Sequence, residues 1–228
     1  MERIILIETS TALCSTALAE NGQITSYRES CAPKAHASLT AVFIQEMLAE
    51  RNLSLSDCDA VCVSKGPGSY TGLRVGVSTA KGLCFGAGLP LLAVSSLEVL
   101  VAKTIATGKV PADCSAIIPV IDARRMEVYS AVFSPDGVQS GEIEPVVITE
   151  DSFREQRSKG RILLIGDGAA KCSEMLPDAA IEQTCPDAAS MLAPALREFE
   201  GGHYENTAYF EPFYLKDFVA TVSRKKLF

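Results

Sequence analysis

The sequence predicts an α/β protein built of two lobes, each with a mixed β-sheet and flanking helices. Three observations lead to this fold class. Residues 4–7 are a continuous apolar run, which suits a central strand covered on both faces. Asn21-Gly22 stands between two strand-like runs and is a strong signal for a β-hairpin. The order of three strands, a helix and a strand then occurs a second time, so the chain contains an internal duplication.

Each half of the chain supplies its own series of elements. In the first half, apolar runs and helical periodicity predict strands at 4–7, 14–19, 23–28, 59–64 and 91–94, and helices at 35–50, 70–87 and 96–106. In the second half we expect strands at 116–121, 127–133, 139–147 and 161–165, and helices near 150–157, 169–176 and 187–200. This order is found in ribonuclease H-like and actin-like folds. With a boundary near 108–113, we divide the chain into an N-terminal lobe, 1–108, which carries the partner-binding helices, and a C-terminal lobe, 109–228.

Composition excludes several classes of protein. The 228 residues are 47% hydrophobic and carry a net charge of −7, which argues against binding of nucleic acid by this chain alone. The only basic cluster is Arg224-Lys225-Lys226. Eight cysteines without a C-x-x-C pair, and only two histidines, favour free thiols over disulfides and give little material for a metal site. No signal peptide or membrane-spanning stretch is evident, so we expect a reduced, cytoplasmic protein.

The most informative segment is residues 65–76, a glycine-dense turn between a predicted strand and a predicted helix. Ser69 is placed to cap a helix that begins near Tyr70. The spacing matches neither a Walker P-loop nor the dinucleotide G-x-G-x-x-G motif. Such a corner can cradle an anion, dock a partner or serve packing alone. Its candidate residues are Gly66, Pro67, Gly68, Ser69, Thr71 and Arg74.

The predicted helices 35–50 and 70–87 each carry more apolar or small-residue surface than packing against one sheet would cover. Four glycines inside the second helix, at 72, 76, 82 and 86, each cost about 0.5–1 kcal/mol relative to alanine. Close approach of another helix or strand would offset this cost. The contact is either a neighbouring helix of the same chain or a helix of another subunit. The candidate interface consists of His36, Leu39, Val42, Phe43, Met47, Tyr70, Gly72, Leu73, Gly76, Val77 and Ala80.

Three acidic residues follow predicted strands and are candidates for a shared cleft. Glu8 ends the first strand, Asp122 follows the strand 116–121, and Asp167 stands between two glycines. They either act on a bound Mg²⁺ and phosphate or accept hydrogen bonds from nearby turns, and we favour the structural role. No Ser-His-Asp or Cys-His arrangement is evident.

Taken in order, several segments resemble the TsaB (YeaZ) family of bacterial tRNA threonylcarbamoyladenosine biosynthesis. The resemblance covers nearly the whole chain and is weakest over 150–210. The most specific segment is the glycine-rich 66–76. The matching segments are Ile5-Leu6-Ile7-Glu8-Thr9-Ser10, His36, residues 66–76, Ile121-Asp122-Ala123-Arg124 and Tyr214-Leu215-Lys216.

This resemblance implies an actin-like ATPase (ASKHA) fold and a non-catalytic subunit in the modification of adenosine 37 of tRNA. It implies pairing with the catalytic paralogue TsaD through the two helices, recruitment of the ATPase TsaE, and a homodimer when the chain is alone. It also implies that tRNA is reached only through the complex. No cofactor is expected on the chain itself, although ATP or ADP at a subunit interface of the complex stays open.

Two departures from relatives bear on the chemistry. TsaD relatives bind metal through H-x-x-x-H on the first helix, whereas here His36 is followed four residues later by Thr40. Glu8 stands where relatives commonly carry aspartate, and the longer side chain would crowd a Mg²⁺–phosphate site. The alternative function is an ATP-dependent enzyme of the sugar-kinase class acting in the inter-lobe cleft. A peptidase is a more distant third.

Overall fold

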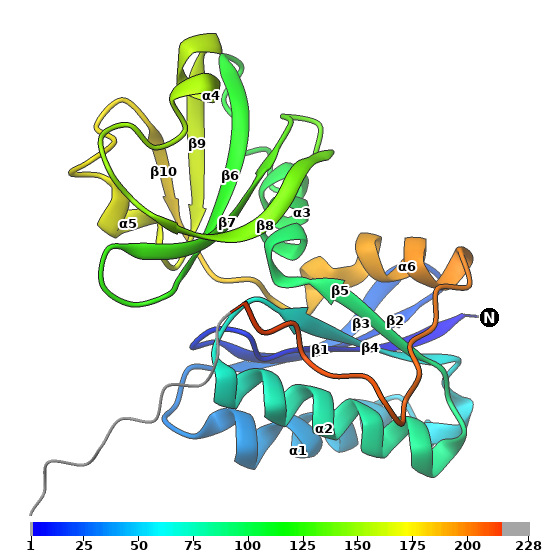
Figure 1. Ribbon diagram of the computed structural model, residues 1–228. Coiled ribbons are helices and arrows are strands. Elements are labelled where there is room, and N and C mark those ends of the chain that lie inside the picture. The colour runs from blue at the N-terminus through cyan, green and yellow to red at the C-terminus, as the bar shows by residue number, and fades with distance from the viewer. Residues whose placement is uncertain (1, 216–228) are drawn as a thin grey trace, which may run out of the picture.

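The computed structural model describes residues 2–215, and its elements follow the predicted order (Figure 1). The first half contains β1 (Arg3–Glu8), β2 (Cys14–Glu20), β3 (Gln23–Ser30), α1 (Ala35–Glu50), η1 (Leu55–Asp57), β4 (Ala60–Gly66), α2 (Tyr70–Ala87), β5 (Leu91–Ser95) and α3 (Ser96–Ala106). The second half contains β6 (Cys114–Asp122), β7 (Glu127–Phe133), β8 (Gln139–Val147), α4 (Arg154–Lys159), β9 (Arg161–Gly166), α5 (Ala169–Cys172), β10 (Ala180–Gln183), η2 (Ala189–Met191) and α6 (Leu192–Glu200). Lys216 and Arg224-Lys225-Lys226 lie outside the described residues.

The two sheets have the same topology, so the predicted duplication is present. Their strand orders are β3-β2-β1-β4-β5 and β10-β9-β6-β7-β8. In each, an antiparallel hairpin is followed by parallel strands, as in the pairings β1–β2 antiparallel and β1–β4 parallel. Two mixed sheets with flanking helices agree with the predicted two-lobed α/β architecture.

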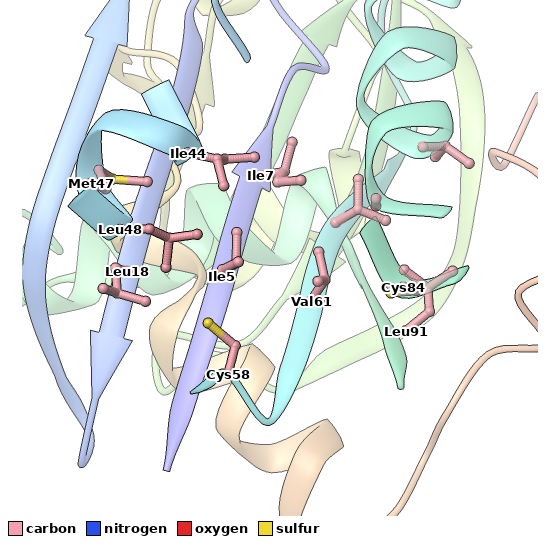
Figure 2. Close-up of a cluster of buried hydrophobic side chains, with 13 residues drawn as sticks. Ile5, Ile7, Leu18, Ile44, Met47, Leu48, Cys58, Val61, Cys84 and Leu91 are labelled. Atoms are coloured by element: carbon pink, nitrogen blue, oxygen red, sulfur yellow. The ribbon is translucent and has the colours of Figure 1, made fainter. Parts of the chain in front are cut away.

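The strands β1, β2, β4 and β5 of the first sheet are almost wholly buried, so this part of the sheet is covered on both faces. Helices α1 and α2 cover one face, which lies away from the second lobe (Figure 1). There Ile44 and Met47 of α1 and Cys84 of α2 pack with Ile5 and Val61 of the strands, all of them buried (Figure 2). Helix α2 begins after the Ser69 cap as predicted, since the Gly72 N–H donates to Ser69 Oγ at 3.3 Å.

The last helix of each half packs against the sheet of the other half. Leu97, Leu100 and Val101 of α3 belong to the core of the second sheet. Met191 and Ala195, in η2 and α6, belong to the core of the first sheet. The chain therefore crosses between lobes twice, which departs from the predicted division at residue 108. That division placed all of 109–228 in the C-terminal lobe.

The C-terminal strap, which we define as residues 203–215, runs from α6 back across the first lobe (Figure 1). The Glu205 N–H donates to the Leu91 carbonyl at 2.8 Å, beside the sheet edge, and the Phe213 N–H donates to the Lys65 carbonyl at 2.8 Å. Between these points Lys81 Nζ of α2 donates to the carbonyls of Ala208 at 3.2 Å and Phe210 at 2.9 Å. The strap is thus fastened at three places, to β5, to α2 and to the end of β4.

Candidate functional site

A cleft of about 840 Å³ lies between the lobes, and the sequence motifs converge on it. The N-terminal lobe contributes the β1–β2 turn, His36 and the start of α2. The C-terminal lobe contributes the β6–β7 turn and Asp167, and the strap contributes Phe213, Tyr214 and Leu215. Of the predicted loop residues, those that line the cleft are Pro67, Gly68, Ser69 and Thr71.

The glycine-rich segment packs tightly against the backbone of the β1–β2 turn. The Ser69 N–H donates to the Ser10 carbonyl at 2.7 Å. A Cβ on Gly68 would lie 2.3 Å from Ser10 O, and one on Gly72 would lie 2.1 Å from Thr9 O. Because atoms cannot approach so closely, only glycine is tolerated at these two positions. Two backbone N–H groups at the start of α2, those of Ser69 and Gly72, are already bonded within the chain.

The mouth of the cleft is closed on one side by an aromatic pair. The rings of Tyr70 and Tyr214 lie 4.8 Å apart between centroids, and the Arg74 guanidinium stands 5.3 Å from the centroid of Tyr70. Gly66 has a φ of 108° and lies beside the strap, since a Cβ there would lie 3.1 Å from Phe213 O. The predicted residues Gly66 and Arg74 therefore lie beside the strap and the aromatic pair, respectively.

Glu8 is buried and serves the local structure of the turn. Its Oε1 accepts the Ser10 N–H at 2.6 Å, while Oε2 is buried without a hydrogen-bond partner among the described residues. Burial raises the pKa of Glu8, against the opposing effect of its hydrogen bonds with Ser10. The Glu8 side chain is fully buried and does not line the cleft, so it is not placed to reach a Mg²⁺ ion there.

The buried Glu8 makes a testable contribution to stability. Since the folded state holds its proton more tightly than the unfolded state, stability falls as the pH rises above the ordinary glutamate pKa of about 4.3. We expect Glu8→Gln to remove this loss. The Tm of the variant minus the Tm of the unaltered chain should therefore increase as the pH is raised from about 4 to about 8. Each kcal/mol corresponds to about 2–4 °C in a chain of this size. Thermal melts over this range test it, with the exposed Glu142→Gln as control; parallel curves for Glu8→Gln and the unaltered chain would contradict it.

Asp122 and Asp167 lie together in the cleft, as predicted, but are bonded to the turn beside them. Asp167 Oδ1 accepts the Asp122 N–H at 3.0 Å, and Asp122 Oδ1 accepts the Arg124 N–H at 2.7 Å and pairs with Lys171. Burial raises the pKa of Asp167. Burial also opposes ionisation of Asp122, but the Lys171 ammonium and the Arg124 amide outweigh it and lower the pKa of that carboxyl. All three predicted carboxylates thus make the structural contacts that we favoured.

His36 is directed to the β1–β2 turn. Its Nε2 lies 2.9 Å from the Thr11 carbonyl, so this nitrogen carries the hydrogen and donates. Thr40 is buried, and its hydroxyl donates to the His36 carbonyl at 2.6 Å. These two positions therefore give no pair of imidazole ligands. Residues 2–215 contain no cluster of three or more His, Cys, Asp or Glu side chains placed to hold a metal ion.

Part of the predicted partner interface is wrong, because six of its residues are buried inside the chain. At Gly72 and Gly76 the close approach is made by the chain itself, since a Cβ on Gly76 would lie 2.2 Å from Thr9 Oγ1, whereas no described atom lies within 4 Å of a Cβ on Gly82 or Gly86. Val42 is exposed, and His36, Leu39, Phe43 and Tyr70 are half-buried. The buried residues are Met47, Gly72, Leu73, Gly76, Val77 and Ala80.

The surface that the two helices do expose contains a residue that the sequence analysis missed. Phe85 of α2 is 88% exposed. It lies on the polar side of the helical wheel, among Arg74, Ser78 and Lys81, and an aromatic ring in that position is the signal that identifies it. We define the outer face as the exposed residues Ala41, Val42 and Gln45 of α1 and Ser78, Gly82, Phe85 and Gly86 of α2.

The outer face is poor in free charge. Glu46 and Glu50, at its margin on α1, pair with Arg28 of β3 at 3.6 Å and 2.7 Å. Lys81, at its margin on α2, is bonded to the strap. An exposed aromatic ring on a surface with few unpaired charges is typical of the centre of a protein–protein interface.

Comparison with known proteins gives a consistent set of matches. A family model described as TsaD, tRNA N6-adenosine threonylcarbamoyltransferase, matches residues 29–223. The tRNA threonylcarbamoyladenosine biosynthesis protein TsaB of Escherichia coli K12 is 32% identical, over 96% of this chain and 96% of its own length. TsaB of Haemophilus influenzae Rd is 31% identical, over 98% of this chain and 96% of its own.

Solved structures agree with this fold. A Pseudomonas aeruginosa protein, described as uncharacterized with similarity to peptidase YEAZ, has a TM-score of 0.83 at 25% identity and covers 95% of this chain and 100% of its own. YeaZ from Pseudomonas aeruginosa has a TM-score of 0.76 at 24% identity, over 94% of this chain and 100% of its own. Among residues 2–215, helices of the length and apolarity needed to cross a membrane are absent.

Proposed function

The chain belongs to the TsaB family of tRNA threonylcarbamoyladenosine biosynthesis proteins, within the wider TsaD family, and we propose that it is a non-catalytic subunit that pairs with a TsaD-type chain. Its role lies in the biosynthesis of threonylcarbamoyladenosine in tRNA. The observation that carries the pairing proposal is the outer face of α1 and α2, on which Phe85 is 88% exposed and the neighbouring acidic side chains are already paired.

Homology between this chain and a TsaD-type chain explains why the outer face is suited to pairing with that chain. The TsaD family model spans α1, α2 and most of the remaining chain, so a TsaD-type chain is expected to present a similar helix pair. Two similar helix pairs can pack about a quasi-two-fold axis, each supplying the same kind of surface. The same geometry allows two copies of this chain to pair when no paralogue is present.

The cleft supports a role without catalysis. Glu8, Asp122 and Asp167 are the acids that nucleotide chemistry would require, and each is engaged by the backbone of a neighbouring turn. Each of the two histidines has a hydrogen-bond partner. His36 Nε2 bonds to the Thr11 carbonyl, and His203 Nδ1 lies 3.1 Å from Glu198 Oε2. Within residues 2–215 neither ring is hydrogen-bonded to a serine, threonine or cysteine side chain, as a nucleophile–base pair of the peptidase kind would require.

The remaining parts of the proposal concern the assembly. We place the chain in the cytoplasm, with a TsaE-type ATPase joining the pair and with tRNA reached through the complex. The net charge of −7 supports indirect contact with tRNA, because affinity for phosphates needs an excess of Lys and Arg. Asp122 and Asp167, the acids that line the cleft, are bonded to the neighbouring turn and to Lys171, which supports the proposal that any ATP or ADP in the complex binds at a subunit interface.

Light scattering on a sizing column tests the proposal. The chain is measured alone and mixed with the TsaD-type paralogue from the same cell. We expect a self-paired species to convert to a one-to-one heterodimer at micromolar concentrations. Failure to form a complex would overturn the proposal. Titration of the isolated chain with MgATP tests the alternative, and binding that Glu8→Gln weakens would favour an enzyme.

A further inference from the structure

A second exposed aromatic residue stands next to the outer face. Among the described large hydrophobic residues, Phe85 at 88% and Tyr209 at 83% are the most exposed, and Val138 follows at 63%. Phe85 belongs to α2 and Tyr209 to the strap. Aromatic residues are enriched at the energetic centres of interfaces, so two exposed rings close together on one surface are informative.

The contacts of Lys81 show that Phe85 and Tyr209 belong to the same part of the surface. It lies one turn before Phe85, and residues four apart are neighbours on a helix. Its ammonium donates to the carbonyls of Ala208 at 3.2 Å and Phe210 at 2.9 Å, which are the residues on either side of Tyr209. The strap thus passes beside the margin of the outer face at the position of Tyr209.

The turn that carries Tyr209 is held in one conformation. Asn206 Oδ1 accepts the N–H groups of Ala208 at 3.0 Å and Tyr209 at 3.3 Å. Phe210, the next residue, packs against the core beneath α1 and α2. Because its flanking residues are fixed, Tyr209 can contact a partner with little loss of conformational entropy.

From this geometry we propose that the strap forms part of the partner surface, with Tyr209 and Phe85 as two aromatic anchors on either side of Lys81. The occupant is the helix pair of the TsaD-type chain, so the inference rests on the proposed function. A helix pair seated on α1 and α2 meets the strap where it crosses the margin of α2. There Tyr209 supplies an apolar ring and a hydroxyl that can remain hydrated at the rim.

Affinity measurements with the full-length chain and the TsaD-type paralogue test this inference. Tyr209→Ser should weaken the heterodimer by about 10-fold or more, without a change in the Tm of the chain alone. Tyr204→Ser is the matched control, because Tyr204 is 51% exposed but packs beside Phe199 of α6, on the other side of the sheet. We expect this control to bind within about 2-fold of the unaltered chain.

A double-mutant cycle separates anchoring from simple fastening of the strap. In a Lys81→Met background, where the ammonium contacts to the Ala208 and Phe210 carbonyls are removed, Tyr209→Ser should cost less affinity than it does alone. If the unaltered chain forms the heterodimer and Tyr209→Ser binds equally well, the inference is overturned and the proposed function stands. If the unaltered chain forms no complex, both are overturned.

Discussion

Gly72→Ala is expected to destabilise this chain strongly, whereas the same substitution ten residues later, Gly82→Ala, should stabilise it. The new methyl group at position 72 would lie 2.1 Å from the Thr9 carbonyl oxygen, while no described atom lies within 4 Å of the position it would take at 82. The clash at 72 involves backbone on both sides, so no rotamer relieves it. We expect a loss of about 3 kcal/mol or more at 72 and a gain of about 0.5–1 kcal/mol at 82.

Urea denaturation of the two variants beside the unaltered chain measures both effects. The experiment is run at a protein concentration where the state of self-association has been measured, because pairing adds to apparent stability. Gly86→Ala is a second control, since Gly86 also has open space at the Cβ position. Equal stabilities for the 72 and 82 variants would show that α2 does not press on the β1–β2 turn.

These glycines show where sequence reasoning reaches its limit. Their cost in a helix correctly indicates a close approach, but the approaching group, Thr9, lies more than sixty positions away and belongs to a turn. From the sequence alone, the approaching group was either a neighbouring helix of the same chain or a helix of another subunit. The contact with Thr9 lies within the chain, so a larger side chain such as leucine at 72 or 76 is expected to disturb folding and not pairing alone.

Elements defined by local signals were predicted well. Helix α2 has a serine cap at its start and Gly88 with a φ of 69° at its end, and both its bounds agree with the prediction. The strand β10 was missed because it has only four residues, half of them exposed, and gains its place by pairing with β9. Local pattern also cannot show that α6 returns to the first sheet, since its amphipathic face would suit either lobe.

The largest expected effect on assembly is loss of the heterodimer in Phe85→Asp. A ring that is 88% exposed in the single chain becomes buried if the outer face is the partner surface, and an aspartate there would lose its hydration without gaining a cation. We expect affinity for the TsaD-type paralogue to fall at least about 100-fold, which equals about 2.7 kcal/mol. Self-pairing of the chain should be lost in parallel.

Val138→Asp is the matched control for this prediction. Val138 is 63% exposed and lies in the β7–β8 turn of the second sheet, whereas α1 and α2 cover the first sheet. Both substitutions add one negative charge to an exposed apolar position, so a general effect of charge on association would weaken both. Sedimentation or calorimetric titration gives the two affinities. A loss confined to Phe85→Asp, with both variants folded, assigns the partner surface to the outer face; equal affinities would remove Phe85 from it and direct attention to the half-buried Leu39 and Phe43 on α1.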